Sequence, residues 1–466
     1  MDITRNDIDE LNATVNIRIS PDDYKEKVDG ILKEHSKKAT MPGFRPGKVP
    51  FGMIKKMYGK SVLAEELNKM LSESLHGYIN ENNVSILGGP LPKNENGLEL
   101  DKEEEFEFDY DIGLAPQFDV NISDKEKFTM YTIKVDDKLL DKYVMDLRKR
   151  QGKVQDVEVA GEEDLINGIF YELDANDTLV EGGIHHHSTI AIEHLEDEGM
   201  KKELIGLKVG DTKVVDPRKV SRGEGDLAAL LGVSAAEAEN ISTNFQLKVE
   251  KVHQVIPADV NQELFDRIFG PGKVNTEEEL REKVSEQLTQ MLSRDADNKF
   301  RKDISEKLLA KLNLALPDEF LKRWIHSSND EPVSMEQIEK DYEDYAKSLK
   351  WRLIENKISE EQDVKVSNEE LVEKAKVYLK EQLVQYGQTE FDEEMLNNTA
   401  QQILGQKEEA QKLYEQVYEE KMLAMYKETF KLSPKEVTFD EFVKIATAKP
   451  GKASLLDNLN NLIKFK

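Results

Sequence analysis

The stretch Pro42-Gly43-Phe44-Arg45-Pro46-Gly47-Lys48-Val49-Pro50 decides how the N-terminal part of the chain folds. It holds two glycines and three prolines in nine residues, a density of helix breakers that predicts a tight loop. A helical pattern precedes it, from about Asp23 to Lys38, and before that the alternation from Leu11 to Ile19 predicts a strand with one buried face. A second helical pattern follows the loop, with apolar residues at Ile54, Met57, Tyr58, Leu63 and Leu67.

The loop lies in a strongly basic window. Between Lys33 and Lys60 there are eight basic residues and one acidic residue, a net charge of +7 within a chain of −28. The Arg45 guanidinium can bind a phosphate through two hydrogen bonds, and Phe44 can bury against a base or an apolar protein groove. The residues alone leave two interpretations open: a docking loop for RNA or protein, or a solvated basic hairpin without a partner.

The composition sets limits on the rest of the molecule. With 466 residues we expect roughly three domains. The net charge of −28 disfavours general binding to DNA or membranes, so any RNA contact must be local. The chain has no cysteine, which excludes disulfides and thiolate chemistry. The first residues lack a signal-peptide pattern and no apolar run is long enough to span a membrane, so we expect a soluble cytoplasmic protein.

Changes in pattern along the chain predict an α+β, multidomain protein. We expect an α+β domain at 1–115, a connector at 116–160 and a small β-rich domain at 161–256. From 257–448 the chain reads as an all-helical domain, with Pro434 among the breaks between helices, and 449–466 reads as a tail.

The run from Gly43 to Pro50 resembles the signature G-F-R-x-G-x-x-P of the bacterial trigger factors. The closing stretch, Lys431 to Phe442, is similar to the end of that family as well. The resemblance implies a ribosome-binding domain that contacts a protein and rRNA beside the exit tunnel. Many members carry Lys where this chain has Pro46, which leaves Arg45 and Lys48 as the main charges. The implied ribosome-binding residues are Gly43, Phe44, Arg45, Pro46, Gly47 and Lys48.

The same resemblance implies a ribosome-associated chaperone that binds nascent unfolded polypeptides and assists folding and export. Trigger factors tend to form homodimers when unbound, and they combine an FKBP-like middle domain with helical arms. Apolar residues spaced by charged ones at Phe320–Ile325, Trp351–Ile354 and Ile403–Met425 are candidates for the polypeptide-binding surface. Taken one by one, the same residues also suit packing between helices. A scaffold that binds folded partners away from the ribosome remains an alternative.

The middle domain is expected to be a degenerate prolyl isomerase. The stretches Leu204–Asp211 and Phe245–Val249 resemble parts of FKBP proteins, whose pocket is dry and lined by aromatic side chains. Between Gln151 and Ile256 the only aromatic residues are Phe170, Tyr171 and Phe245, which we assign to a vestigial pocket. We therefore assign no catalytic residue, and isomerase as the main activity stays an alternative.

A run of histidines, His185-His186-His187 with His194 beyond it, raises the question of a metal site. On a strand, His185 and His187 would share a face and offer two ligands at most. No cysteine exists to complete a site, and no carboxylate lies at a fixed spacing. We therefore expect an exposed strand edge, with no metal and no cofactor.

Overall fold

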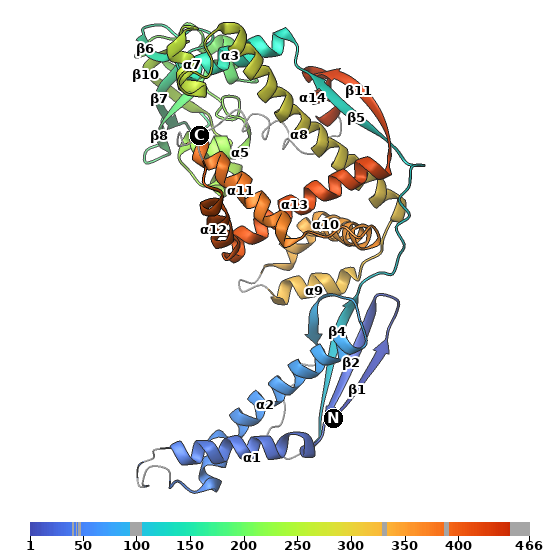
Figure 1. Cartoon of the computed structure of the whole chain (residues 1–466). Coiled ribbons are helices and arrows are strands. Elements are labelled where there is room, and N and C mark those ends of the chain that lie inside the picture. The colour runs from blue at the N-terminus through green and yellow to red at the C-terminus, as the bar shows by residue number, and fades with distance from the viewer. Residues whose placement is uncertain are drawn as a thin grey trace. The chain divides into compact units, whose positions relative to one another are not determined.

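The computed structural model describes residues 1–39, 42, 44, 48–93, 105–328, 333–385 and 391–447, drawn in Figure 1. The chain divides into two compact units, each assembled from segments that are far apart in the sequence. The first unit comprises Met1–Thr129, Phe300–Gln382 and Glu390–Ser433; the second comprises Met130–Lys299, Leu383–Thr389 and Pro434–Lys466. Helices and strands occur in both, so the expected α+β, multidomain class is confirmed. None of the helices in these ranges has the length and apolar character needed to cross a membrane.

The N-terminal part of the first unit is a four-stranded antiparallel sheet with two helices on it. Its strand order is β1 (Asp2–Asp7), β2 (Asn12–Ile19), β4 (Phe106–Leu114) and β3 (Ile86–Pro92). The apolar residues of β2 form a core with helices α1 (Pro21–Lys38) and α2 (Phe51–Glu81). The strand expected at Leu11–Ile19 is thus confirmed within one residue, whereas β1 was not expected.

Helix α1 begins with a capping box. The Asp23 carboxylate accepts a 2.8 Å hydrogen bond from the Ser20 backbone N–H, and Pro21 occupies the first helical turn. The N-terminal ammonium lies 2.8 Å from the same carboxylate. These contacts, the ammonium first, lower the pKa of Asp23 to about 2. The first residue of the chain therefore helps to fix the start of the helix.

The second face of β2 is also buried, which differs from the prediction of one buried face. Thr14 and Asn16 are 7% and 8% exposed. Thr14 donates a 3.0 Å hydrogen bond to Asp111, and Asn16 donates 2.8 Å bonds to Glu107 and Asp109. Polar side chains can be buried here because they satisfy each other across the β2–β4 pair.

Helix α9 (Asp318–Ser328) fastens the sheet to the helical part of the first unit. A Cβ atom added to Gly113 in β4 would lie 2.5 Å from Cδ1 of Phe320, so only glycine allows this approach. Trp324 packs in the same way on Gly88, and Arg323 donates a 3.0 Å hydrogen bond to Asp111. This sheet–α9 junction also includes Leu87, which lies in one apolar cluster with residues of α9 and α10.

The rest of the first unit is helical. It contains the second part of α8 (Glu277–Leu312), most of α11 (Asn368–Gln385) and the whole of α10 (Met335–Glu361), α12 (Glu393–Leu404) and α13 (Lys407–Thr429). Phe128 packs edge-on against Phe300, with ring centroids 5.9 Å apart, and joins the strand that follows the sheet to α8. Most of the expected helical segment is therefore confirmed as helix.

The second unit contains a five-stranded antiparallel sheet with a single apolar core. Its main path runs β6 (Lys153–Val157), β10 (Phe245–Ile256), β7 (Leu165–Glu172) and β8 (His185–Ala191), while β9 (Thr212–Val215) also pairs with β10. Strand β6 lies in the stretch assigned to the connector. The helices of this part are short: α4 (Glu198–Leu204), α5 (Gly223–Leu231), α6 (Ala235–Glu239) and the 3₁₀ turn η1 (Ile192–His194).

Other parts of the second unit surround the first part of α8. Helices α3 (Asp137–Arg150) and α7 (Gln262–Phe269) share an apolar cluster with it, and α14 (Phe439–Thr447) shares another. The C-terminal segment also contains a strand, β11 (Lys431–Thr438), which pairs with β5 (Lys127–Lys134). Pro434 is therefore part of a strand and does not simply separate two helices. A two-stranded ribbon has free edges, where the missing N–H of proline is tolerated.

We predict opposite effects for two alanine substitutions in the first unit. Gly113→Ala lowers the free energy of unfolding by about 1–3 kcal/mol, because its Cβ displaces Phe320. Gly77→Ala, in α2, raises it by about 0.5–1 kcal/mol, because a Cβ there meets no atom within 4 Å. Urea denaturation followed by tryptophan fluorescence measures both, since Trp324 and Trp351 belong to this unit. Equal effects of the two substitutions contradict the role given to the junction.

Candidate binding surfaces

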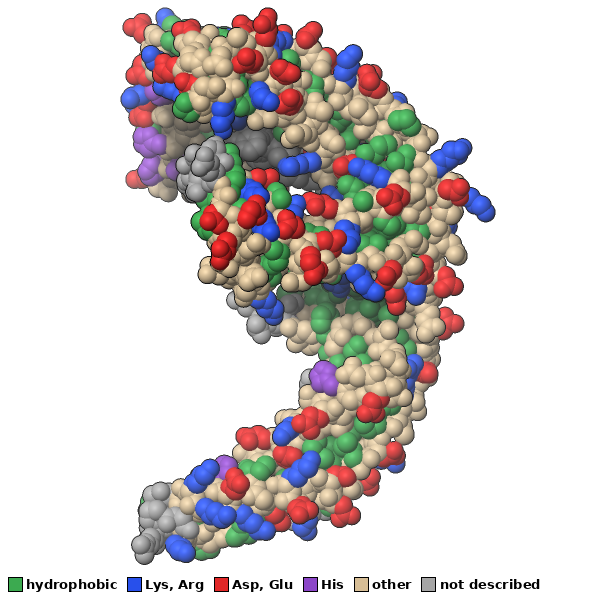
Figure 2. Space-filling model, viewed as in Figure 1, with side chains coloured by type: hydrophobic (Ala, Val, Ile, Leu, Met, Phe, Trp, Pro, Cys, Tyr) green, Lys and Arg blue, Asp and Glu red, His purple; other side chains and the backbone are tan. Residues whose placement is uncertain are grey.

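A basic surface covers the end of the α1–α2 pair. Lysines 33, 37 and 38 are exposed in the last turns of α1, and lysines 48, 55, 56 and 60 are exposed at or near the start of α2. Figure 2 shows blue side chains at the lower end of the view, where these two helices lie. Of the predicted ribosome-binding residues, Phe44 and Lys48 are described and exposed. Gly43, Arg45, Pro46 and Gly47 lie outside the described residues.

The residues that flank the loop are fixed to the core of the N-terminal part. The Ser36 hydroxyl of α1 donates a 3.0 Å hydrogen bond to the carbonyl of Val49. Val49 is 4% exposed and Ile54 is fully buried, both in the core under the sheet. The described residues on both sides of the loop are therefore anchored to the core.

Apolar side chains extend this surface along α2. Met53, Met57 and Tyr58 are 41%, 55% and 41% exposed. The helical pattern that included Met57 and Tyr58 is confirmed as α2, but its buried stripe contains Ile54 and the residues one or more turns beyond Tyr58. We call the combined surface the basic tip, made of Lys33, Lys37, Lys38, Phe44, Lys48, Met53, Lys55, Lys56, Met57, Tyr58 and Lys60.

The three aromatic residues assigned to a vestigial isomerase pocket do not lie together around an opening. Phe170 and Phe245 are fully buried in the core of the sheet. Tyr171 follows Phe170 on β7, opposite Gln246, so its half-buried side chain lies on the other face. Two of the three therefore serve as core residues, and the third lies apart from them.

The histidines lie on β8 and just beyond it. His187 is exposed, and its Nδ1 lies 3.1 Å from a carboxylate oxygen of Glu250 on β10. His185 is exposed on the same face, while His186 lies against Gly232 at the end of α5. His194 ends the η1 turn. Across the described ranges, no three His, Cys, Asp or Glu side chains are grouped in a way that suits a metal.

The helical part of the first unit exposes apolar residues mostly outside the segments that the sequence singled out. In the three candidate segments, Phe320, Leu321, Ile354 and Met422 are buried and pack between helices. Exposed apolar side chains stand on α11, α12 and α13, and we call them the arm surface: Val377, Tyr378, Met395 and Tyr414, between 41% and 49% exposed. Of these four, only Tyr414 lies in a candidate segment, Ile403–Met425. A signal existed for α11, because Val377 and Tyr378 fall outside the buried stripe that contains Ala375 and Leu379.

Ion pairs join the helices that carry the arm surface. Lys374 and Lys421 link α11 and α13 through Glu420 and Glu370, each at 2.6 Å. Lys380 lies 2.9 Å from Glu393 at the start of α12. Exposed pairs of this kind each contribute about 0–1 kcal/mol. They therefore link the three helices but add little to the free energy of unfolding.

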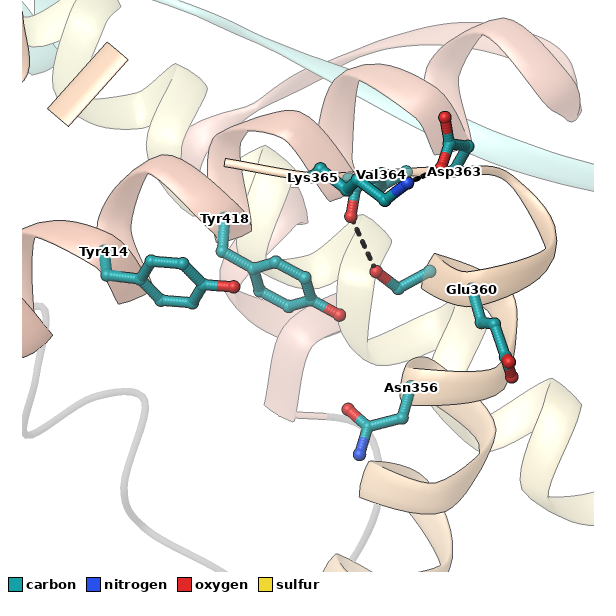
Figure 3. A pocket seen from close by; sticks show the side chains of 8 residues that line it. Asn356, Glu360, Asp363, Val364, Lys365, Tyr414 and Tyr418 are labelled. Carbon is teal, nitrogen blue, oxygen red and sulfur yellow. Dashed lines mark hydrogen bonds and ion pairs between the residues drawn. The ribbon is translucent and has the colours of Figure 1, made fainter. Parts of the chain in front are cut away.

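A hollow of about 460 Å³ opens between α10 and α13, shown in Figure 3. The rings of Tyr414 and Tyr418 stack along α13, with centroids 6.3 Å apart and planes 8° apart. The Tyr418 hydroxyl is buried and lies beside the Ser359 side chain. The lining residues are Asn356, Ser359, Glu360, Asp363, Val364, Lys365, Tyr414 and Tyr418.

We predict that Phe170→Ala acts through stability. Removing a fully buried ring costs about 3–5 kcal/mol, whereas Tyr171→Ala costs less than about 1 kcal/mol because that side chain is half-exposed. Hydrogen exchange of the β7 and β10 amides in the intact chain measures the difference. Similar protection in both variants contradicts the placement of Phe170 in the core.

Comparison with known proteins gives the same assignment along the chain. Residues 1–147 match the model described as "Bacterial trigger factor protein (TF)". Residues 154–257 match "Probable trigger factor, FKBP-like domain", and residues 296–446 match "Probable trigger factor, C-terminal domain".

Curated relatives carry the same name. The trigger factor of Pelagibacter ubique is 24% identical over 93% of this chain and 87% of its own length. That of Bartonella bacilliformis is 24% identical over 95% and 92%, and that of Chloroherpeton thalassium is 22% identical over 78% and 84%. A solved structure of a trigger factor chaperone aligns with 91% of this chain at 17% identity and a TM-score of 0.39. From the three family models in order, together with these relatives, the chain belongs to the trigger factor family.

Proposed function

We propose that this chaperone docks on the ribosome through its basic tip and holds emerging unfolded polypeptides against its helical body in the cytoplasm. The observation that carries the proposal is the basic tip itself. A window of net charge +7 stands at the exposed end of α1 and α2 in a chain whose total charge is −28. The signature that includes Phe44 and Arg45 lies between these two helices.

Electrostatics favours a single orientation on the ribosome. Lysine side chains attract RNA phosphates, and neutralising phosphates releases counterions, so binding weakens as salt rises. The excess of acidic residues elsewhere repels the same surface. Phe44, Met53 and Met57 add apolar contact area, which suits an adjoining protein groove because methionine adapts to varied shapes. The tip thus offers contacts for both rRNA and an exit-tunnel protein.

The helical body would act as a binding surface and not as a catalyst. The arm surface offers separate apolar side chains amid charged ones, which allows weak contacts with many sequences. Docking near the exit tunnel raises the effective concentration of this surface around a nascent chain. Because the sheet–α9 junction joins the docking domain and the helical body in one unit, anchoring one anchors the other.

Prolyl isomerisation as the main activity has less support. An isomerase needs aromatic side chains that face a prolyl peptide, and Phe170 and Phe245 are committed to the core. We therefore assign the middle domain a structural or binding role. Catalysis of a proline-limited refolding reaction at low concentrations of this protein would overturn that assignment.

We predict that Phe44→Ala combined with Arg45→Ala weakens ribosome binding by about tenfold or more, because an apolar contact and a phosphate contact are both lost. Co-sedimentation with ribosomes at several salt concentrations measures the affinity. The slope of log affinity against log salt concentration is expected to fall by about one, because one phosphate contact is lost. Lys153→Ala with Val154→Ala is the matched control, since it removes one cation and one exposed apolar chain from β6. An unchanged affinity in the Phe44 and Arg45 variant contradicts docking through the tip.

We also predict that Tyr378→Ser combined with Met395→Ser weakens chaperone action. Each change removes partly exposed apolar area worth about 1 kcal/mol or less in binding, so suppressing aggregation of a denatured model protein requires about threefold to tenfold more of the variant. Light scattering measures this, with Val154→Ser and Val209→Ser as a control pair of similar exposure in the middle domain. If both pairs behave alike, the arm surface is not the binding surface.

A further inference from the structure

We propose that His185 and His187 form a surface site on the middle domain that binds a divalent transition-metal ion. Each histidine supplies one imidazole nitrogen, Glu250 positions His187, and water completes the coordination. The inference goes beyond the proposed chaperone function and does not depend on it. It gives a role to a face of the middle domain that belongs neither to the basic tip nor to the arm surface.

The two histidines lie on the same exposed face of β8. They are two residues apart in an extended strand, so their side chains lie on one side and their Cα atoms are about 6.6 Å apart. His186, between them, lies on the opposite face, against Gly232. Figure 2 shows purple histidine side chains at the left of the view, where Figure 1 places β8. Strand β8 ends the path β6–β10–β7–β8, so the pair stands at an edge of the sheet.

A carboxylate determines which nitrogen of His187 can bind a metal. Nδ1 of His187 lies 3.1 Å from a carboxylate oxygen of Glu250. A carboxylate only accepts hydrogen bonds, so Nδ1 carries the hydrogen of the neutral ring and the lone pair of Nε2 stays available. Metal-binding histidines are commonly held in this way, through the nitrogen that does not bind the ion. The His187 side chain is 66% exposed, so an ion can reach the ring from solvent.

A β-bulge places Glu250 beside His187. In the pairing of β10 with β7 the register shifts on either side of Glu250, which makes it the extra residue, and a bulge re-aims a side chain in this way. The carboxylate thereby reaches across β7 to β8. Lys248 lies in the same row as His187 but two strands away, or about 10 Å, so its ammonium does not fill the site. The sequence alone indicated no metal here, because it could not show the contact from Glu250.

Two imidazoles suit a transition metal better than Mg²⁺ or Ca²⁺. Nitrogen ligands favour Ni²⁺, Cu²⁺ and Zn²⁺, whereas Mg²⁺ and Ca²⁺ prefer oxygen. Metal–nitrogen bonds of about 2.0–2.1 Å place two tetrahedral ligand nitrogens about 3.3 Å apart, which rings on alternate residues can reach by rotation about χ1. Among the described residues no group of three ligands exists, so the site is a two-point chelate.

Strand β10 provides a comparison within the same sheet. Nδ1 of His253 lies 2.8 Å from a carboxylate oxygen of Asp156, as His187 does from Glu250. The positions two residues away hold Lys251 and Val255, so no second histidine shares its face there. The histidine–carboxylate pair occurs in both places, and only β8 adds a second imidazole. His253 is therefore a matched control.

Isothermal titration calorimetry of the full chain with NiCl₂ tests the inference, in an excess of Mg²⁺ that occupies weak carboxylate sites. We expect one Ni²⁺ per chain. His185→Ala and His187→Ala each lower the affinity about tenfold or more, because the chelate is reduced to one ligand. Glu250→Ala lowers it about tenfold, and Glu250→Gln lowers it less because the amide oxygen still accepts from Nδ1. His253→Ala and His186→Ala leave the affinity unchanged.

A spectroscopic measurement separates coordination from a change in folding. With one equivalent of Cu²⁺, electron paramagnetic resonance shows coupling to two imidazole nitrogens in the unaltered chain and to one in His185→Ala or His187→Ala. Circular dichroism of these variants without metal is unchanged, because both side chains are exposed.

The inference is overturned if the unaltered chain binds no Ni²⁺ under these conditions. It is also overturned if His185→Ala and His187→Ala bind Ni²⁺ as the unaltered chain does, which would indicate an adventitious ion only, or if His253→Ala weakens binding as much as His187→Ala. Ribosome co-sedimentation and suppression of aggregation test the proposed function separately, and both stay unchanged in these variants.

Discussion

The contact between Phe320 and Gly113 is the constraint on which the first unit depends. Any side chain at Gly113 would place its Cβ 2.5 Å from the Phe320 ring, so the sheet can meet α9 only because that position is glycine. Trp324 on Gly88 and the 3.0 Å hydrogen bond from Arg323 to Asp111 extend the same contact. Tight packing of this kind responds to small changes in volume, so the N-terminal sheet and the helices of the first unit are held as one unit.

The negative net charge of the chain has two opposing effects, on self-association and on approach to the ribosome. A surface that exposes apolar side chains such as Val377 and Tyr378 tends to associate with copies of itself, and a net charge of −28 opposes that association. The same charge would repel the ribosome, whose surface is rich in phosphate. If the chain docks as proposed, the lysines at the end of α1 and α2 resolve the conflict, because Debye screening limits repulsion from acidic residues farther than about 10 Å away.

Local patterns in the sequence were sufficient to predict the helices and strands that bury one stripe or one face. Helix α1 and strand β2 follow directly from their spacing, whereas β1 does not, because Asp2–Asp7 pairs with β2 through its backbone and has little apolar alternation. Strand β11 was missed because its partner, β5, lies some 300 residues away in the sequence. The sequence analysis assigned Phe170 and Tyr171 to one vestigial isomerase pocket. These two residues are neighbours in an expected strand, so the alternation of side chains already indicates that they face opposite ways.

A chaperone must bind unfolded chains without trapping them, and the arm surface proposed to bind them suits that requirement. One partly exposed side chain such as Met395 offers about 1 kcal/mol or less, which does not hold a chain for long. Several such side chains together do, because a segment tethered at one site finds the next at high effective concentration. As folding proceeds, the segment buries its own apolar side chains, so these contacts would weaken at the point where protection is no longer needed.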